Sequence, residues 1–316
     1  MVTRNPAFGF ALVLTGALLF IVNAGVSRVA LRAGVDPSTL TTVRVTGTFV
    51  VLLAFAVVFH RGALRPPNGR LALLLVALGV IGVALLQWSY FVAIDRLPVG
   101  MALLLEYQAP ILVALWARLV QKEPVRHRMW LGLALAMLGL VAATGIWKGA
   151  SFDAVGIAAG LGAGVCLATY FLIGEHGVGL LDPVRVILWS FLVATVALNL
   201  VWPITDLPTD LLTESTSLLG VLGGYDAPVW LVLAWIIVLG TLMPFGIELF
   251  ALRHLRATTV TMVAMLEPVG VSALGWLWFY ERLDAVALVG GVAVVVGIVL
   301  AQSARRAHVV IEPPHL

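Results

Sequence analysis

Four polar side chains in the first half of the chain lie at one depth inside apolar segments. Asn23, Gln87 and Glu106 are each about seven residues from the outer end of their segment, and so is Arg44. With a helical rise of about 1.5 Å per residue, all four would lie roughly 10 Å below the outer surface of a membrane. Ionisable groups inside a bilayer cost roughly 2.5–3.5 kcal/mol each on insertion scales, so they indicate function by default. The pattern predicts a few polar groups, Asn23 and Gln87 among them, that bind a substrate in an apolar wall.

Glu106 is the member of this set that is best suited to chemistry. Its carboxyl group could attract a cationic group of a substrate, or it could take up a proton in exchange for the substrate. Alternatively, Glu106 forms a structural ion pair with Arg44, which lies at a similar depth. Arg44 itself is interpreted as a structural residue, or as one whose side chain extends toward the outer surface.

The second half of the chain carries two further carboxyl groups inside apolar segments. Glu267 lies about ten residues into its segment, near the midplane, and Glu248 lies nearer the inner end of its own segment. We predict that Glu267 shares the role of Glu106 in handling a proton or a cationic group. Glu248 is predicted to bind substrate unless it reaches water at the helix end. Three aromatic residues are predicted to shape the wall of the site: Trp88, Tyr107 and Tyr170.

Two prolines interrupt the segments that carry these carboxyl groups. Pro110 follows Glu106 by four residues, and Pro268 comes directly after Glu267. A proline inside a helix removes a backbone hydrogen bond, so both residues are predicted to kink their helices. Irregular backbone is tolerated at membrane depth where it borders a cavity or another helix. The kinks therefore either line the site or only shape the packing.

Other kinds of chemistry are disfavoured by what the sequence lacks. It has no HExxH, GxxxxGK[ST] or GxSxG motif and no cluster of Cys and His, so we expect no metal, no cofactor, no catalytic residues and no ATP hydrolysis. The one cysteine, Cys166, lies in an apolar segment and is interpreted as a packing residue. The net charge of +3 is attributed to membrane topology, and no nucleic-acid partner is expected.

The elements that must position these residues are membrane helices. Hydrophobic residues make up 61% of the 316 residues and charged residues only 11%, whereas soluble domains carry about a quarter charged residues. In lipid, every backbone group needs a partner inside its own segment, so long apolar runs must be helical. Ten spans are predicted, near 8–30, 40–60, 71–94, 99–120, 128–147, 154–174, 183–203, 228–252, 258–279 and 285–303.

The chain also repeats itself. A shift of 158 residues aligns Pro110 with Pro268, and upstream a shift of 146 aligns Asp36 with Asp182. The second copy therefore has about a dozen extra residues, in the long connection 204–227. Because five spans are an odd number, the second copy must enter the membrane in the opposite sense. The sequence predicts an all-α integral membrane protein with two inverted five-helix repeats, at 8–147 and 154–303, and a cytoplasmic tail at 304–316.

Positive charges orient the chain in the membrane. Of the 19 Lys and Arg residues, 13 lie on one side of the predicted spans, five lie on the other, and Arg44 lies within a span. Cytoplasmic connections carry the excess of Lys and Arg, so both termini are predicted to lie in the cytoplasm, with the protein in the plasma membrane.

Glycines recur at spacings that place them on one face of a helix. They occur every four residues at Gly156, Gly160 and Gly164, and every seven residues at Gly132, Gly139, Gly290 and Gly297. Small residues let helices approach closely. These positions are expected to pack within the chain or at the seam of a homodimer.

The two copies resemble the EamA family of the drug/metabolite transporter superfamily, whose repeats have an apolar helix with Pro, a small-residue turn and then Glu. This pattern runs here from Pro110 to Glu123 and from Pro268 to Glu281. Within that family, the stretch Leu105–Pro110, together with Pro244, Glu248 and Glu267, is similar to threonine/homoserine exporters in residue type and spacing. Glu123 and Glu281 themselves lie just beyond their spans and are interpreted as anchors that pair with nearby Lys or Arg.

The resemblance implies a secondary transporter that exports small metabolites, such as amino acids, by alternating access driven by protons. Its partners would be a small-molecule substrate and the lipid bilayer. The polar residues themselves predict a central cavity lined by spans 1, 3, 4, 6, 8 and 9, which carry all of them apart from Arg44. An exporter of cationic drugs or dyes is the alternative within the same class. An intramembrane enzyme acting on lipid-linked substrates would need clustered Asp or His at one membrane face. A scaffold that transports nothing would need structural partners for its buried carboxyl groups.

Overall fold

A computed structural model describes the chain except residues 1–4, 98, 124–125, 145–152, 281–284 and 304–316. Within the described residues, nine helical spans are long and apolar enough to cross a membrane, and a tenth apolar helix is shorter. This confirms the predicted all-α membrane fold. Glu281, Lys148 and the predicted tail lie outside the described residues. The α-helices are α1 (Pro6–Arg32), α2 (Pro37–Phe59), α3 (Gly69–Ala77), α4 (Leu86–Arg96), α5 (Val99–Glu106), α6 (Ala109–Leu119), α7 (His127–Thr144), α8 (Ala154–Leu180), α9 (Pro183–Val201), α10 (Val229–Ile237), α11 (Met243–Ala251), α12 (Ala257–Ala264), α13 (Leu266–Phe279) and α14 (Ala285–Ser303).

Equivalent helices of the two copies begin at the same kind of cap. The carboxylate of Asp36 accepts a hydrogen bond from the backbone N–H of Ser38 at 2.9 Å, and that of Asp182 accepts one from Val184 at 3.0 Å. In both helices a proline occupies the first turn. Such caps satisfy amide groups that a helix N-terminus leaves without partners. The repeated Asp-Pro pair therefore starts both α2 and α9.

Two spans contain π-helical turns at equivalent positions. One, η2 (Leu78–Leu85), lies between α3 and α4, and the other, η7 (Val238–Leu242), lies between α10 and α11. Gly82 and Gly240 occupy the same place in the two turns, because they are 158 residues apart. π-helical turns loosen the regular backbone ladder and occur frequently at functional sites.

Two other spans are broken at their prolines. Helix α5 ends at Glu106 and α6 begins at Ala109, with Pro110 in its first turn. In the second copy, α12 ends at Ala264 and α13 begins two residues before Pro268. The backbone is therefore interrupted at both prolines, where the sequence predicts kinks. Discontinuous helices of this kind form the binding sites of many secondary transporters.

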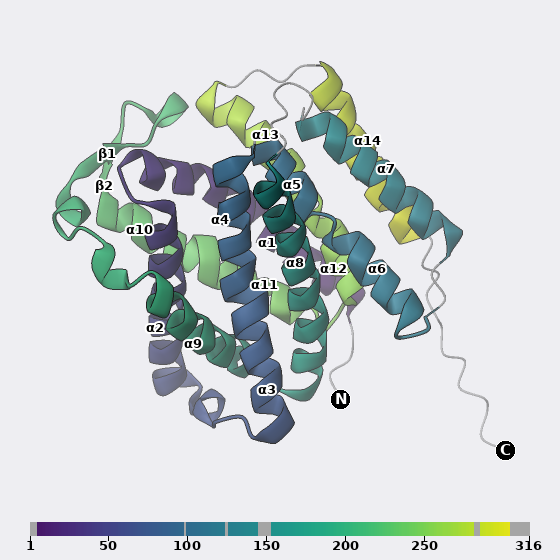
Figure 1. The fold of residues 1–316 in the computed structure, drawn as a ribbon, viewed down its shortest axis with the longest axis horizontal. Coiled ribbons are helices and arrows are strands. Elements are labelled where there is room, and N and C mark those ends of the chain that lie inside the picture. The colour runs from purple at the N-terminus through teal and green to yellow at the C-terminus, as the bar shows by residue number, and fades with distance from the viewer. Residues whose placement is uncertain (1–4, 98, 124–125, 145–152, 281–284, 304–316) are drawn as a thin grey trace.

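The two copies pack against each other about an approximate two-fold axis. Helix α7 lies along α14 (Figure 1), with Gly132 against Gly297 and Gly139 against Gly290. Exchanging the copies turns one of these contacts into the other, as at an isologous interface. Helix α1 packs on α11, and its equivalent α8 packs on α4, the equivalent of α11. Because α7 and α14 run antiparallel, the axis lies perpendicular to them and the repeats are inverted.

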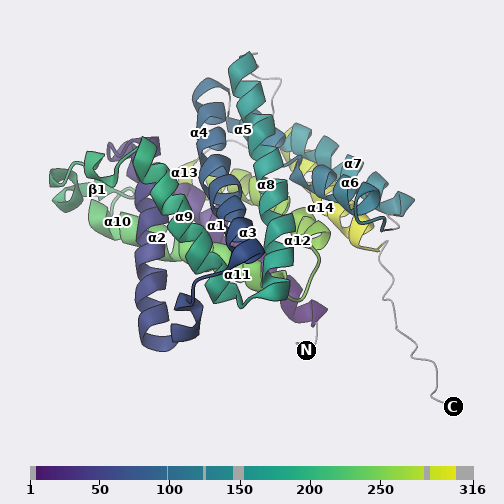
Figure 2. The same ribbon diagram turned by 60° about the horizontal axis from the view of Figure 1, so that its bottom comes forward.

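The long connection of the second copy has a fold of its own. Strands β1 (Ser215–Ser217) and β2 (Asp226–Pro228) pair antiparallel, on the opposite side of the molecule from the α7–α14 pair (Figures 1 and 2). The indole N–H of Trp278, near the end of α13, donates to the carbonyl oxygens of Leu218 and Leu219 at 3.2 and 3.3 Å. The connection is therefore held on the end of α13.

Replacing Trp278 with phenylalanine is expected to loosen this connection without unfolding the protein. The change removes the indole donor, and a hydrogen bond of this kind contributes about 1 kcal/mol, which corresponds to roughly fivefold more frequent opening. Limited proteolysis within residues 204–227 should accelerate by a similar factor. Trp230→Phe is the matched control, because Trp230 is 53% exposed on α10. Equal cleavage rates in the two variants would contradict the role of Trp278.

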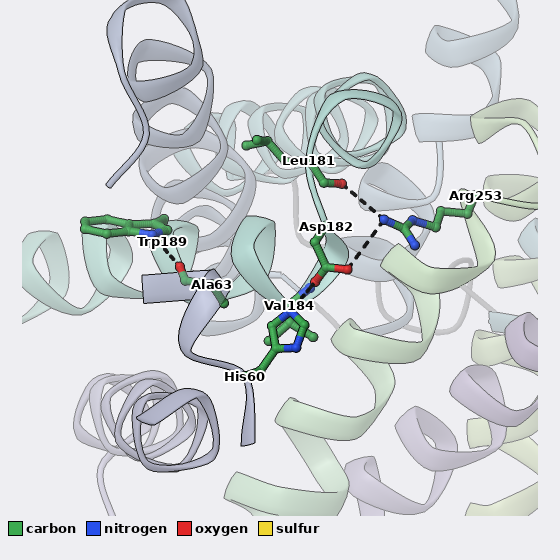
Figure 3. Close-up of polar contacts among 7 residues, drawn as sticks. All are labelled: His60, Ala63, Leu181, Asp182, Val184, Trp189 and Arg253. Carbon is green, nitrogen blue, oxygen red and sulfur yellow. Dashed lines mark hydrogen bonds and ion pairs between the residues drawn. The ribbon is translucent and has the colours of Figure 1, made fainter. Parts of the chain in front are cut away.

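A polar cluster joins the copies at the start of α9 (Figure 3). The carboxylate of Asp182 lies 3.3 Å from Nε2 of His60 and 3.6 Å from Nη2 of Arg253. The indole N–H of Trp189 donates to the carbonyl oxygen of Ala63 at 3.1 Å. His60 and Ala63 belong to the first copy, whereas Asp182, Trp189 and Arg253 belong to the second.

Two substitutions of Asp182 are expected to separate its cap from its ion pairs. Asparagine retains an oxygen that can cap α9 but loses the charge, and ion pairs this exposed contribute about 0–1 kcal/mol. Alanine also loses the cap, which costs about 1 kcal/mol more. Thermal unfolding in detergent should therefore rank wild type, Asp182→Asn and Asp182→Ala in falling order. A full loss already in the asparagine variant would assign the stabilisation to the ion pairs.

Candidate functional site

The two helix breaks are joined by a side-chain hydrogen bond between the copies. Tyr107 lies in the break between α5 and α6, and its hydroxyl group donates to Oε2 of Glu267 at 2.6 Å. Glu267 lies in the first turn of α13, directly after the other break. Hydrogen bonds from a hydroxyl group to a carboxylate are short and strong. This bond therefore fixes the two irregular backbone segments relative to each other.

Three carboxyl groups gather around Tyr107. Glu106, Glu248 and Glu267 all lie within electrostatic range of its hydroxyl group, and Glu267 is also within range of the other two carboxyl groups. Glu248 is only 3% exposed and packs against Gly16 of α1, so it does not reach water at a helix end. Carboxylates within electrostatic range repel each other, and a cationic group or a proton relieves the repulsion.

Several ionisable groups of this region are only partly buried. Glu106 and Glu267 keep some accessible surface, and the same holds for Arg44 and Tyr90. These polar and ionisable side chains lie among largely apolar helices, and a few polar groups in an apolar wall are typical of small-molecule sites.

Asn23 and Tyr170 lie at equivalent places beside the two π-helical turns. The side chain of Asn23 packs directly against Gly240, and Tyr170 packs against Gly82. Tyr170 also lies within electrostatic range of Glu248. The two turns thus bring one predicted site residue from each copy against the backbone of the other copy.

Gln87 and Trp88 are neighbours in α4 with different surroundings. Gln87 is 7% exposed, and its Nε2 has no hydrogen-bond partner within the described residues. Trp88 is 41% exposed, and its ring lies 6.4 Å from the ring of Trp202. Adjacent helical residues point about 100° apart. Trp88 therefore lies beside Trp202 of the second copy, whereas Gln87 is buried.

The structure gives Arg44 two partners that the sequence did not single out. Nε of Arg44 donates to the hydroxyl group of Thr241 at 3.0 Å, and Nη2 lies 3.5 Å from the carbonyl oxygen of Gly240. The structure thus gives Arg44 partners other than Glu106. Tyr90 lies within electrostatic range of both Arg44 and Glu106. In the sequence, only the alignment of Gly82 with Gly240 could have pointed to the backbone beside Arg44.

A separate polar pocket of about 200 Å³ lies where α6 of the first copy meets α8 and α12 of the second. Glu123 forms an ion pair with Arg256 there, and the carboxylate of Glu175 accepts a hydrogen bond from the backbone N–H of Ala257 at 3.1 Å, at the start of α12. Glu123 therefore anchors a helix end, as expected, but its partner belongs to the other copy and is not a neighbouring Lys or Arg.

The described part of the chain has no arrangement suited to metal chemistry. No group of three or more His, Cys, Asp or Glu side chains within it is placed to hold a metal ion. Cys166 is buried and packs with Leu86 and Ala163.

The sequence matches known proteins along most of its length. The profile of the EamA-like transporter family matches residues 7–145 and 154–302. The threonine/homoserine exporter RhtA of Escherichia coli (strain K12) is 28% identical over 251 residues, which cover 79% of this chain and 76% of that protein. An uncharacterized transporter of Archaeoglobus fulgidus is 26% identical over 294 residues, covering 92% of this chain and 94% of that protein. A solved crystal structure shares the fold at a TM-score of 0.74 and 19% identity, covering 96% of this chain and all of that one.

Proposed function

The chain belongs to the EamA-like transporter family of the drug/metabolite transporter superfamily, and we propose that it exports small amino acids in exchange for protons. Members of this family are transporters and not enzymes, so the intramembrane enzyme is excluded as an alternative. The chain is a multi-pass membrane protein. The plasma membrane is its proposed location, with both termini in the cytoplasm, on the side that carries most Lys and Arg.

The observation that carries the proposal is the carboxyl cluster at the helix breaks. Glu106, Glu248 and Glu267 come from both copies and meet around Tyr107, whose hydroxyl group bonds to Glu267. An amino acid carries a cationic ammonium group that such a cluster attracts. The same carboxyl groups can hold a proton when the substrate is absent, so binding of one would release the other. Glu106 and Glu267 are proposed as the coupling residues.

The inverted arrangement of the copies supports alternating access. In transporters built from inverted repeats, one repeat or bundle moves against the other around a fixed central site. The Tyr107–Glu267 bond links the copies at the proposed site, whereas the Glu123–Arg256 and Asp182–Arg253 pairs lie near helix ends. We propose that the pairs at the helix ends break and reform as access changes sides.

The substrate class is supported by the relatives named threonine/homoserine exporters, in Escherichia coli and in Salmonella typhimurium, each 28% identical to this chain. The alternative within the same class, a cationic drug or dye, is favoured by the excess of carboxyl groups in the cluster. A carboxyl cluster recognises only the cationic part of a ligand, so it does not by itself separate the two substrates.

An exchange experiment separates these substrates without an imposed gradient. Proteoliposomes loaded with unlabelled threonine should take up labelled threonine well above the rate of protein-free liposomes, and they should not exchange ethidium. Ethidium exchange with no threonine exchange would replace the amino-acid proposal with export of cationic drugs.

A further inference from the structure

Two half-helices connect the candidate site with the face that carries most Lys and Arg. Helix α6 runs from the break at Tyr107 toward Glu123, and α12 runs from Arg256 to the break before Glu267. The 8 residues of α12 rise about 12 Å along its axis, so the pair spans the distance from the breaks to the helix ends. The backbones of α6 and α12 pack closely on each other (Figure 1). A path between these two helices to the site is therefore closed.

The ends of α6 and α12 away from the breaks are joined by charged contacts between the copies. Glu123, which follows α6, forms an ion pair with Arg256, which directly precedes α12. The carboxylate of Glu175 in α8 accepts a hydrogen bond from the backbone N–H of Ala257 at 3.1 Å. The polar pocket of about 200 Å³ lies at this junction, and Val113 of α6 lines it together with the charged side chains. The ion pair thus holds the two half-helices together beside a polar pocket.

The equivalent half-helices of the exchanged copies are not packed in this way. Under the shift of 158 residues, α12 corresponds to α5, and α6 corresponds to the first part of α13. Within the described residues, the backbones of α5 and α13 hardly approach each other. Helix α8 likewise packs on α12, whereas its equivalent α1 hardly approaches α5 in the described part of the chain. The repeats therefore follow the two-fold relation at α7 and α14 and depart from it at the half-helices.

The sequence allows this ion pair on one face only. Glu123 aligns with Glu281, so a carboxyl group recurs in both copies, but Arg256 aligns with Pro98, which carries no charge. The pair that joins α6 to α12 therefore has no counterpart at the aligned positions. A contact that exists in only one of two conformations shifts the equilibrium toward that conformation. The ion pair thus favours closure of the face that carries most Lys and Arg.

We infer that α6 and α12 form the gate on this face, that the gate is closed in the structure, and that the Glu123–Arg256 pair is its lock. This inference rests on the proposed function and specifies how access to that site is controlled. The half-helices α5 and α13 form the gate on the opposite face, which is open in this state and has no equivalent lock. The lock therefore favours the state in which the carboxyl groups face the side with few Lys and Arg, from which protons would load them.

The experiment measures how fast a charged, membrane-impermeant thiol reagent modifies single cysteines from each side of sealed vesicles of known orientation. Cys166→Ala removes the native thiol from the full-length chain. Val113→Cys reports on the gate of α6 and α12, because Val113 is buried beside the pocket. Val271→Cys reports on the opposite gate, because Val271 is the aligned, partly buried residue of α13. Val113→Cys should react slowly from the face rich in Lys and Arg, whereas Val271→Cys should react faster from the other face.

Removing either charge of the pair should release the lock. Glu123→Gln and Arg256→Gln should each speed the modification of Val113→Cys roughly two- to fivefold, the range that follows from the modest contribution of a partly exposed ion pair. The double variant should add little to either single change, because both remove the same interaction. Arg118→Gln removes a charge from an exposed position of α6 and should leave the rate near wild type.

Each outcome decides the inference. Equal rates for the two cysteines from their own faces, or a Val113→Cys rate that removal of the pair leaves unchanged, would overturn it. A general loosening of the fold would also speed Val271→Cys, which should instead stay the same or slow, so faster reaction at both positions would overturn it too. If one variant of the pair does not fold, the other removes the same ion pair and takes its place. Labelling requires no substrate, so the predicted rates without threonine transport would support the gate and contradict only the proposed function.

Discussion

Replacing Glu267 with glutamine is expected to reduce proton-driven threonine transport by roughly 10- to 100-fold, the loss expected when a hydrogen-bonded charge is removed. Glutamine has nearly the shape of glutamate, and its oxygen can still accept the hydrogen bond from Tyr107. It can neither become negative nor exchange a proton. The fold should therefore persist while the coupling step is lost. The measurement is the initial rate of labelled threonine uptake into proteoliposomes under an imposed pH gradient.

Two control variants show whether the loss of transport depends on the charge of Glu267. Glu214→Gln makes the same chemical change at an exposed position in the long connection and should leave transport near wild type. Tyr107→Phe removes the hydroxyl group that bonds to Glu267 but keeps the carboxyl group, so a smaller loss is expected. Undiminished gradient-driven transport in Glu267→Gln would remove this residue from the mechanism.

Replacing Gly290 with alanine is expected to destabilise the protein by about 1–3 kcal/mol, the usual cost of an overpacked contact. A Cβ atom at this position would lie 2.6 Å from the carbonyl oxygen of Gly139 and 2.8 Å from the carbonyl carbon of Ala142. These are backbone atoms of α7, so a side-chain rotation cannot relieve the clash. Helices α7 and α14 would have to separate at the seam between the copies.

The direction of the stability change distinguishes a tightly packed glycine from an ordinary helical one. Alanine favours a helix over glycine by about 1 kcal/mol, so a helix position without contacts should gain stability. Gly179 in α8 is such a position, because no atom lies within 4 Å of its added Cβ. Thermal unfolding in detergent should show a lower midpoint for Gly290→Ala and an unchanged or higher midpoint for Gly179→Ala. Similar midpoints in both variants would contradict the close packing of α7 on α14.

The spans were predictable because lipid requires long apolar helices. Their duplication was predictable because matching residues recur at a fixed shift along the chain. A backbone in hydrocarbon must satisfy its own polar groups, so the apolar runs had to be helices. The alignment of Gly132 and Gly139 with Gly290 and Gly297 reflects one contact that is made twice. It left open whether these glycines pack within the chain or between two chains, and the structure places them within it. Which helices meet depends on tertiary packing, which a hydropathy pattern does not contain.

The site was predictable by depth but not by direction. Counting residues along a span gives the height of a side chain, so Gln87 and Trp88 were both assigned to the site. Their surroundings differ because they point in different directions from α4. In a membrane helix that is apolar on every side, periodicity does not show which side faces the partner helix. The same limit concealed the contact between Arg44 and Thr241.

The irregular segments were predictable only where a proline causes them. Pro110 and Pro268 mark the breaks because a proline has no backbone N–H group to donate the helical hydrogen bond. The turns η2 and η7 contain no proline, and their backbone depends on how neighbouring helices pack against Gly82 and Gly240. The bond between Tyr107 and Glu267 was also hidden, since its equivalent in the exchanged copies would join Met265 and Ala109, which cannot form it.

The most direct test of the account is threonine uptake by wild-type proteoliposomes with and without a pH gradient. With an acidic lumen, protons leave as threonine enters, so uptake should exceed that at equal pH and should fall to that level when an ionophore collapses the gradient. Uptake that is the same under all three conditions would contradict exchange of an amino acid for protons at the carboxyl cluster between the two repeats.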